Sequence, residues 1–531
     1  MGRWGWTLAL AGCGGDNGRA VSDEFANEYL PEKSIAELQA DLLTGKVTSK
    51  QLVEGYLRRI EMLDRDGPTL RAIIELNPDA GKIASKSDAD RRVGRLRGPL
   101  HGIPIVLKDN IDTGDKMLTT AGSLAMVTSR PAEDATLVFR LRMSGAVILG
   151  KTNMSEWANF RSAHSSSGWS GRGGQARNPY VLTHGPSGSS SGSAVAASAS
   201  LAAVAIGTET DGSIVSPANA CGIVGVKPTV GLVSRAGVIP ISASQDTIGP
   251  MARTVTDAAL LLGALTGVDP KDGATAASRG KLWHDYTRYL KADGLKGARI
   301  GVLRKVYTGY HAQTDALFEA AVTGMRAAGA VIVDPADLAT AEEMRDSEGE
   351  LQVLMYEFKR DLEAYLAKRL PISGKSERDV PRTLDDLIQF NLDHEKEELT
   401  VFGQDMLERC ERLKLTEAEY REILATNRRL AGREGIDAVL QEHRLDAIVA
   451  PTGSPAGKQG PGDLDKFLGG SSSPAAMVGY PIVTVPMGFV GELPVGISFI
   501  GAAWSEPTLL RLAFAYEQRT LWRRAPKYLA T

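Results

Sequence analysis

Residues 185–193 read Gly-Pro-Ser-Gly-Ser-Ser-Ser-Gly-Ser, and residues 207–217 read Gly-Thr-Glu-Thr-Asp-Gly-Ser-Ile-Val-Ser-Pro. The segment between them, Ala194 to Ile206, consists almost only of Ala, Val, Leu and Ser. Small side chains let a helix pack closely in a core, and glycine on both flanks lets backbone N–H groups approach a bound group. The pattern therefore predicts a buried segment whose two hydroxyl-rich ends meet in one pocket.

Upstream, residues 101–112 read His-Gly-Ile-Pro-Ile-Val-Leu-Lys-Asp-Asn-Ile-Asp. Ile103 to Leu107 is typical of a short buried strand, and Lys108 follows at its end. A lysine after a strand is commonly a solvated loop residue, but here it can point into the core beside the serine loops. A buried lysine loses its charge readily, and the neutral amine can then accept a proton from a serine hydroxyl.

These segments, together with Cys221-Gly-Ile-Val-Gly-Val-Lys-Pro-Thr229, resemble the amidase signature family over about residues 33 to 520. The resemblance implies an α/β fold, with a central mixed β-sheet covered by helices on both faces and a helical insertion. It implies a Ser-Ser-Lys triad without cofactor or metal, in which Ser213 is the nucleophile, Ser189 the bridging serine and Lys108 the base. It also implies a cis peptide bond between Gly188 and Ser189. The oxyanion hole would consist of the backbone N–H groups of Thr210, Asp211, Gly212 and Ser213.

The sequence departs from the family pattern in two motifs. The Gly-Gly pairs that flank the serine motif are Ser187-Gly188 and Ser191-Gly192 here, and Asp211 stands where the nucleophile motif has glycine. Its carboxylate could exclude a substrate carboxylate, bind a substrate amine, or cap a local turn. With residues 151–160 and 168–180, the segment is most similar to the bacterial peptide amidases, which remove the C-terminal amide of peptides and release ammonia. We expect the loop of residues 160–180 to help line a substrate groove. Aryl or aliphatic amides are the alternative substrates.

Three other interpretations use the same residues. Gly188-Ser-Ser-Ser-Gly192 matches the nucleophile elbow of α/β-hydrolases, with Ser190 as nucleophile. Its histidine would be His284, His311, His394 or His443. That elbow leaves residues 207–229 and Lys108 unexplained. A second alternative is the glutaminase subunit of tRNA-dependent amidotransferases, which shares the family core but needs a protein partner. A third is a binding protein without activity, but such a protein would not need all three catalytic residues.

The composition narrows the function classes. The 531 residues carry a net charge of −3, so no basic field points to nucleic acid. The cysteines, Cys13, Cys221 and Cys410, are too few for a disulfide framework, and the seven histidines show no metal-ligand spacing. The sequence contains no run of 18 or more apolar residues, the length that a membrane-spanning helix needs. We expect a small-molecule or peptide amide as substrate and no obligatory protein partner.

The N-terminus has a different character. Arg3 and the apolar residues 4–11 resemble a short secretion signal, and Leu10-Ala-Gly-Cys13 resembles the bacterial lipobox, whose cysteine is acylated. Residues 14–18 would be a flexible tether. We therefore predict a leader over residues 1–30, a single domain over residues 31–531, and a periplasmic or membrane-anchored lipoprotein with its lipid on Cys13; the alternative is a cytoplasmic protein.

The rest of the chain alternates helix and strand signals. Ser34-Ile-Ala-Glu37 and Thr48-Ser-Lys-Gln51 are capping boxes, each of which predicts an amphipathic helix. Residues 340–430 are rich in Glu, Lys, Arg and Leu at helical spacing, so we expect a helical elaboration with a solvated face that could wall the substrate pocket. Residues 453–475, rich in Gly, Ser and Pro, indicate a loop that could border the site. Further helices or strands are expected at 134–144, 146–149, 298–303, 317–333 and 446–450.

Overall fold

A single large mixed β-sheet organises the molecule. The computed structural model describes residues 21–459 and 468–531. Its main sheet has 11 strands, in the order β1 (Ile73–Leu76), β4 (Val147–Thr152), β2 (Pro104–Lys108), β7 (Val204–Glu209), β9 (Thr247–Ala252), β8 (Val224–Lys227), β14 (Ile482–Val490), β15 (Leu493–Ile500), β13 (Ala447–Pro451), β10 (Arg299–Val302) and β11 (Val331–Val333). Strand β2 runs parallel to both β4 and β7, whereas β7 pairs antiparallel with β9. The sheet is mixed, as the family resemblance implies.

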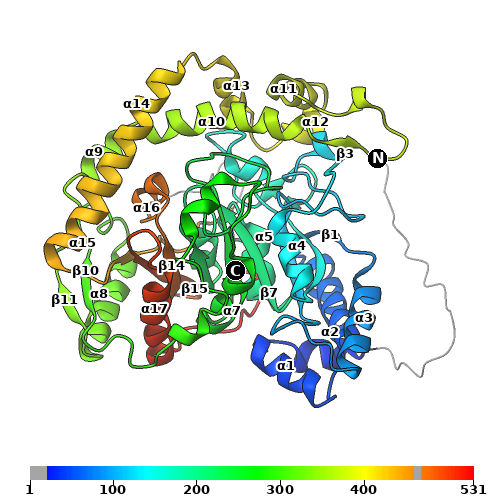
Figure 1. Ribbon diagram of the computed structural model, residues 1–531, viewed down its shortest axis with the longest axis horizontal. Coiled ribbons are helices and arrows are strands. Elements are labelled where there is room, and N and C mark those ends of the chain that lie inside the picture. The colour runs from blue at the N-terminus through cyan, green and yellow to red at the C-terminus, as the bar shows by residue number, and fades with distance from the viewer. Residues whose placement is uncertain (1–20, 460–467) are drawn as a thin grey trace.

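Both faces of this sheet are buried. Along β13, Ala447 and Val449 join one hydrophobic cluster, while Ile448 and Ala450 join another. Because successive side chains of a strand point to opposite faces, the two clusters lie on opposite sides of the sheet. The helices that cover the sheet surround it in Figure 1. They include α5 (Ser191–Ser198), α6 (Val215–Ala220), α7 (Val255–Leu265), α8 (Ala312–Ala327), α16 (Ser473–Val478) and α17 (Glu506–Thr520).

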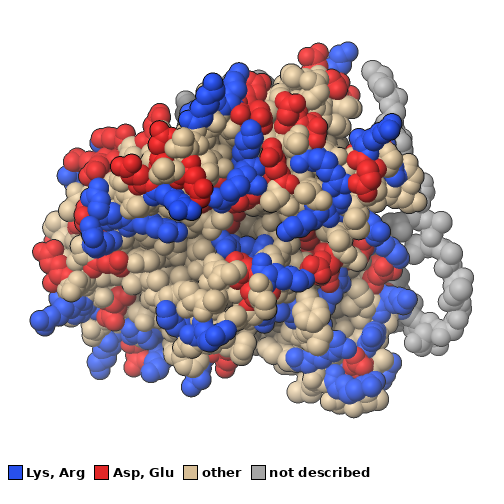
Figure 2. All heavy atoms as spheres, turned by 45° about the horizontal axis from the view of Figure 1, so that its top comes forward, with Lys and Arg blue, Asp and Glu red and all other residues tan. Residues whose placement is uncertain are grey.

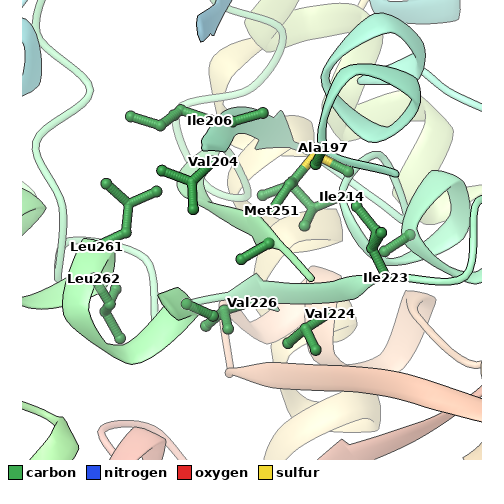
Figure 3. Close-up of a cluster of buried hydrophobic side chains, with 14 of the residues drawn as sticks. Ala197, Val204, Ile206, Ile214, Ile223, Val224, Val226, Met251, Leu261 and Leu262 are labelled. Carbon is green, nitrogen blue, oxygen red and sulfur yellow. The ribbon is translucent and has the colours of Figure 1, made fainter. Parts of the chain in front are cut away.

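The small-residue segment between the two serine loops is not one helix. Helix α5 ends at Ser198, and Ser200 adopts a left-handed conformation with φ of 54°, a common way to end a helix. Strand β7 then begins at Val204, where β-branched Val204 and Ile206 favour an extended chain. Figure 3 shows both side chains in the buried cluster with Ala197 of α5. The segment therefore gives a buried helix and the neighbouring strand.

The remaining local predictions agree closely with the structure. Both capping boxes are present, and they open α1 (Ile35–Leu43) and α2 (Ser49–Arg59). The other expected elements are found as α4 (Thr136–Met143) with β4, β10, α8 with β11, and β13. Elements beyond these include α3 (Ala80–Arg92), α15 (Asp437–His443) and two small sheets, β12 (Leu370–Pro371) with β3 (Ser129–Arg130) and β5 (Trp169–Ser170) with β6 (Gly174–Gln175).

The charged region between residues 340 and 430 is helical, as predicted. It contains α9 (Ala341–Asp346), α10 (Gly349–Leu366), α11 (Leu384–Asp393), α12 (Glu395–Glu398), α13 (Asp405–Arg412) and α14 (Glu417–Arg428). These helices arch over one edge of the body in Figure 1. Their apolar side packs on the body, since Phe358 and Leu362 share a buried cluster with Met126 and Trp157. The outer side carries Lys, Arg, Asp and Glu intermixed, without a field of one sign (Figure 2).

The predicted lipobox with Cys13 lies outside the described residues, so the leader and the lipid anchor stay predictions. In the described part of the chain, no helix is both long and apolar enough to span a bilayer. The same part holds no cluster of His, Cys, Asp and Glu that could bind a metal ion. Cys221 and Cys410 are buried and unpaired with each other.

Candidate active site

Lys108 and Ser189 form the buried centre of the site. Lys108 is the last residue of β2 and Ser189 lies just before α5; both side chains are 0% exposed. Lys108 Nζ lies 2.7 Å from Ser189 Oγ, and it also donates to Thr208 through the carbonyl oxygen (3.2 Å) and Oγ1 (2.9 Å). The bond between Gly188 and Ser189 is cis, as the family resemblance implied. The predicted contact between a strand-end lysine and a loop serine is therefore present.

Burial sets the charge state of Lys108. Removal from water lowers the pKa of Lys108 to about 7, and the negative charges of Asp246 and Glu209 oppose this only in part. Burial also raises the pKa of Asp246 to about 6, against hydrogen bonds from Thr210 Oγ1 and two backbone N–H groups. At neutral pH a large fraction of Lys108 is thus a free amine, which has the lone pair that a base requires.

Backbone contacts hold the two serine loops together. The N–H of Ser190 donates to the carbonyl oxygen of Ser213 at 3.1 Å, which places Ser189 beside the second loop. Ser213 is 7% exposed, so its side chain is nearly buried but still reachable. The hydroxyl of Ser190 is fully buried and donates to the Thr208 carbonyl at 3.0 Å. This orientation contradicts the nucleophile-elbow interpretation, which needs Ser190 exposed at a sharp turn.

The loop of residues 210–213 is shaped by Glu209 and Gly212. Glu209 Oε2 accepts from the N–H groups of Ile214 (2.6 Å) and Val215 (3.0 Å), so the carboxylate closes the loop at the start of α6. Gly212 has φ of +75°, a conformation that strains other residues. Among the described residues, no protein acceptor is bonded to the N–H groups of Asp211, Gly212 and Ser213. These groups are free to bind an anionic oxygen.

A cavity of about 650 Å³ opens beside this loop. Its wall includes Gly188 and Gly212, which flank the two serines. The helical insertion and the loop of residues 453–475 both border it, as predicted; of residues 160–180 only Ser167 does so. The lining also includes Asn159, Ser187, Asp211, Ser216, Asn219, Tyr307, Met344, Arg345, Glu350, Thr452, Ser472, Ser473 and Met477. Arg172 of that loop pairs with Glu75 and Asp109 and does not line the cavity.

Asp211 does not cap a local turn. Its Oδ2 accepts from Ser473 Oγ at 2.7 Å, across the cavity wall, while Oδ1 is buried without a hydrogen-bond partner among the described residues. Glu350 of α10 shares the cavity and accepts from Gln245 at 2.8 Å. Burial, and then the negative charge of Asp211, raises the pKa of Glu350. The cavity thus has an acidic side next to the loop of Ser213.

Sequence reasoning missed Glu350, Thr208 and Asn110. Glu350 lies in a charged helical region, where a solvated face was the natural expectation, and nothing local marks it. Thr208 and Asn110 each lie in a motif quoted above, but two or more residues away from the predicted triad member in that motif. In the structure, Asn110 Nδ2 donates to Thr208 Oγ1 at 3.0 Å. Only the pairing of β2 with β7 brings these two together.

An α/β fold with a buried Lys–Ser pair beside a large cavity indicates an enzyme, and comparisons with known proteins identify its family. The sequence model of the Amidase family matches residues 51–510. The chain is 43% identical to a probable amidase of Arabidopsis thaliana, over 94% of this chain and 92% of the relative. It is 34% identical to a glutamyl-tRNA(Gln) amidotransferase subunit of Chloroflexus aurantiacus, over 92% and 97% of the two chains.

Among solved structures, native peptide amidase from Stenotrophomonas maltophilia is 54% identical. Its TM-score is 0.88, with 94% of this chain and 99% of that chain covered. The chain belongs to the amidase family. It is a hydrolase that acts on amides, with the amidase-signature fold.

Proposed function

We propose that this enzyme hydrolyses the C-terminal amide of peptides and releases ammonia, through a Ser-Ser-Lys triad of Ser213, Ser189 and Lys108. The observation that carries the proposal is the buried 2.7 Å contact between Lys108 Nζ and Ser189 Oγ, on a loop bonded to the backbone of Ser213. The similarity to the peptide amidase of Stenotrophomonas maltophilia supports the substrate class.

In acylation, Ser213 Oγ attacks the amide carbonyl carbon. Its proton passes to Ser189 Oγ, whose own proton passes to the neutral amine of Lys108. The C–N bond then breaks, and the same relay returns the proton to the departing nitrogen, which leaves as ammonia. Water attacks the resulting ester by the reverse path, giving the free carboxylic acid and the original serine.

The negative oxygen that forms during attack needs hydrogen-bond donors. We assign this role to the backbone N–H groups of the loop Thr210, Asp211, Gly212 and Ser213, because those of residues 211–213 have no protein acceptor in the described chain. Each such donor typically contributes about 3 kcal/mol to the transition state. A loop held by Glu209 and Gly212 keeps the donors in place before the substrate arrives.

The shape of the cavity suits a peptide on the acyl side. Its wall offers polar side chains from separate segments, including Asn159 and Ser454, as partners for an extended chain. The departing group is only ammonia, so the leaving-group side needs little room. We therefore expect internal peptide bonds, with their bulky leaving groups, to resist hydrolysis.

The test is incubation of an amidated pentapeptide and its free-acid twin with the enzyme, followed by mass spectrometry and an ammonia assay. The amidated peptide is expected to gain the mass difference between NH2 and OH, in step with ammonia, while the free acid stays whole. Fragmentation of the free acid would contradict the proposed substrate class.

A second candidate is glutaminase activity of the amidotransferase type, which the 34% identity to the Chloroflexus aurantiacus protein favours. Free glutamine in the same assay decides between the two. Rapid ammonia release from glutamine with an inert peptide amide would select this candidate and leave the family assignment intact.

A further inference from the structure

A second cavity, which we call the rear cavity, has in its wall Thr208, the residue that contacts Lys108. It measures about 240 Å³, and its wall includes Asn110, Thr208, Asp246 and Thr247. None of these four residues lines the substrate cavity. Thr208 is nevertheless the residue that contacts Lys108 Nζ through both its carbonyl and its hydroxyl. Thr208 thus links Lys108 to the rear cavity.

The contacts of Lys108 match the donors and the lone pair of a neutral amine. Such an amine has two N–H groups and one lone pair. The carbonyl of Thr208 can only accept, so it takes one N–H. If Thr208 Oγ1 takes the second N–H at 2.9 Å, the lone pair is left for the proton of Ser189 at 2.7 Å. If the Thr208 hydroxyl donates instead, it competes with Ser189 for that lone pair.

Asn110 restricts which of these arrangements the threonine adopts. Its Nδ2 donates to Thr208 Oγ1 at 3.0 Å, so one of the two lone pairs of that oxygen is occupied. One lone pair and one proton remain, for Lys108 and for the rear cavity. A proton acceptor in the rear cavity therefore binds the hydroxyl proton of Thr208 and turns it away from Lys108. The remaining lone pair of Thr208 Oγ1 then faces an N–H of the lysine amine.

The side-chain carbonyl oxygen of Asn110 indicates what the proton acceptor in the rear cavity is. Asn110 is only 3% exposed, yet its Oδ1 has no hydrogen-bond partner in the described part of the chain. A buried carbonyl without a partner is costly, and buried water commonly satisfies such groups where there is room and more than one polar partner. One water that accepts from Thr208 Oγ1 and donates to Asn110 Oδ1 satisfies both groups.

We propose that Asn110 and Thr208 are positioning residues for Lys108, acting with a water bound in the rear cavity to keep the lysine lone pair directed at Ser189. The proposal rests on the proposed function, in which Lys108 is the base. When Lys108 takes up the proton of Ser189, all three contacts accept from its ammonium, so the same arrangement also stabilises the protonated state during the reaction.

The charged groups around Lys108 allow a test by pH dependence. Asp246 and Glu209 are the carboxylates that act on it, and burial opposes their effect. Arg235 and Asp272, at the rim of the rear cavity, pair with each other. Removing the Thr208 hydroxyl takes one acceptor from the ammonium form, whereas a carboxylate at position 110 adds a negative charge near it. The two changes should move the titration of Lys108 in opposite directions.

The experiment measures kcat/KM against pH for the wild type and for Thr208→Val, Thr208→Ser and Asn110→Asp, with an amidated peptide as substrate. Thr208→Val is expected to lose activity and to shift the acid midpoint to lower pH by about one unit. Thr208→Ser, which keeps the hydroxyl, should restore the wild-type midpoint. Asn110→Asp should shift it to higher pH.

Thr247→Val is the matched control, because Thr247 is a buried threonine of the same cavity wall whose hydroxyl has no partner in the described chain. It should leave the midpoint unchanged. Lys108→Ala is measured alongside and should be inactive. In that case, an unchanged acid midpoint in Thr208→Val, or no upward shift of the midpoint in Asn110→Asp, overturns the proposal. An active Lys108→Ala would instead refute the proposed function.

A crystal structure of the wild type should show the water between Thr208 and Asn110. A different solvent arrangement at this place would overturn the proposed role of the water.

Discussion

Ser190 donates its backbone N–H to the carbonyl oxygen of Ser213 at 3.1 Å, and this bond joins the two serine loops. Main-chain atoms therefore hold the loops of Ser189 and Ser213 together without help from the Ser213 hydroxyl, while the Ser189 hydroxyl contacts Lys108. The hydroxyl of Ser190 serves the same purpose, since it donates to the Thr208 carbonyl. Loss of a catalytic hydroxyl should consequently leave the geometry of the site intact.

The first prediction concerns the nucleophile. Ser213→Ala should reduce kcat for an amidated peptide by on the order of 1,000-fold or more, as removal of a serine nucleophile does elsewhere. The midpoint of thermal unfolding should stay at the wild-type value, because the backbone bond to Ser190 survives. Steady-state kinetics and calorimetry measure the two quantities. An active Ser213→Ala together with an inactive Ser190→Ala would move the nucleophile to Ser190.

The second prediction concerns pH. Lys108 must be neutral to accept a proton, and burial lowers its pKa to about 7. Activity should therefore fall as the pH drops through about 7, since the ammonium form has no lone pair, and it should level off above that value. The measurement is kcat/KM between pH 5 and pH 9, about two units on either side of the midpoint. A rate that is constant across this range would exclude Lys108 as the base.

The third prediction concerns Asp211, whose Oδ1 is buried in the cavity wall without a partner among the described residues. This charge should repel the carboxylate of the product. Asp211→Asn keeps the shape and a carbonyl acceptor for Ser473, so inhibition by the free-acid peptide should become stronger by about tenfold or more. The inhibition constant of the free acid measures this directly.

Asp23→Asn is the control for the charge at position 211. Asp23 is exposed and paired with Arg58, and neither residue lines the cavity, so its loss should not change product inhibition. Equal inhibition constants for the wild type and Asp211→Asn would show that the carboxylate of Asp211 does not exclude the product.

Local signals in the sequence predicted local structure well. The capping boxes at Ser34 and Thr48 are contained within four residues each, and both open helices in the structure. The order of strands in the sheet could not be predicted in this way. Strand β8 lies between β9 and β14, whose residues are far apart in the chain, and this pairing depends on packing of the whole core.

The candidate site shows the same division. Lys108, Ser189 and Ser213 follow from motifs, because each has a distinctive neighbourhood in the chain. Glu350 does not, since a glutamate in a charged helix gives no sign of facing a cavity. Asn110 stands inside a motif, but its role depends on a hydrogen bond to Thr208 on the neighbouring strand. Such contacts follow from tertiary structure alone.

The fourth prediction concerns the attachment of the helical insertion. The guanidinium of Arg161 is fully buried, donates to Glu156 (2.7 Å) and Glu398 (3.2 Å), and lies 4.1 Å from the ring centre of Phe402. Glu398 belongs to α12 of the insertion and also accepts from the N–H of Leu124 in the body. Arg161 therefore joins the insertion to the body through charges that have no access to water.

Arg161→Met should lower the free energy of unfolding by about 3–5 kcal/mol, because the carboxyl groups of Glu156 and Glu398 are left buried without the cation that both of them contact. The triple variant with Glu156→Gln and Glu398→Gln should recover most of that loss, since no buried charge is then unpaired. Arg421→Ala is the control: it breaks an exposed pair with Glu417 on α14 and should cost less than about 0.5 kcal/mol. Denaturant unfolding of the four proteins measures these differences. If Arg161→Met and Arg421→Ala were equally stable, the buried cluster would not hold the insertion to the body.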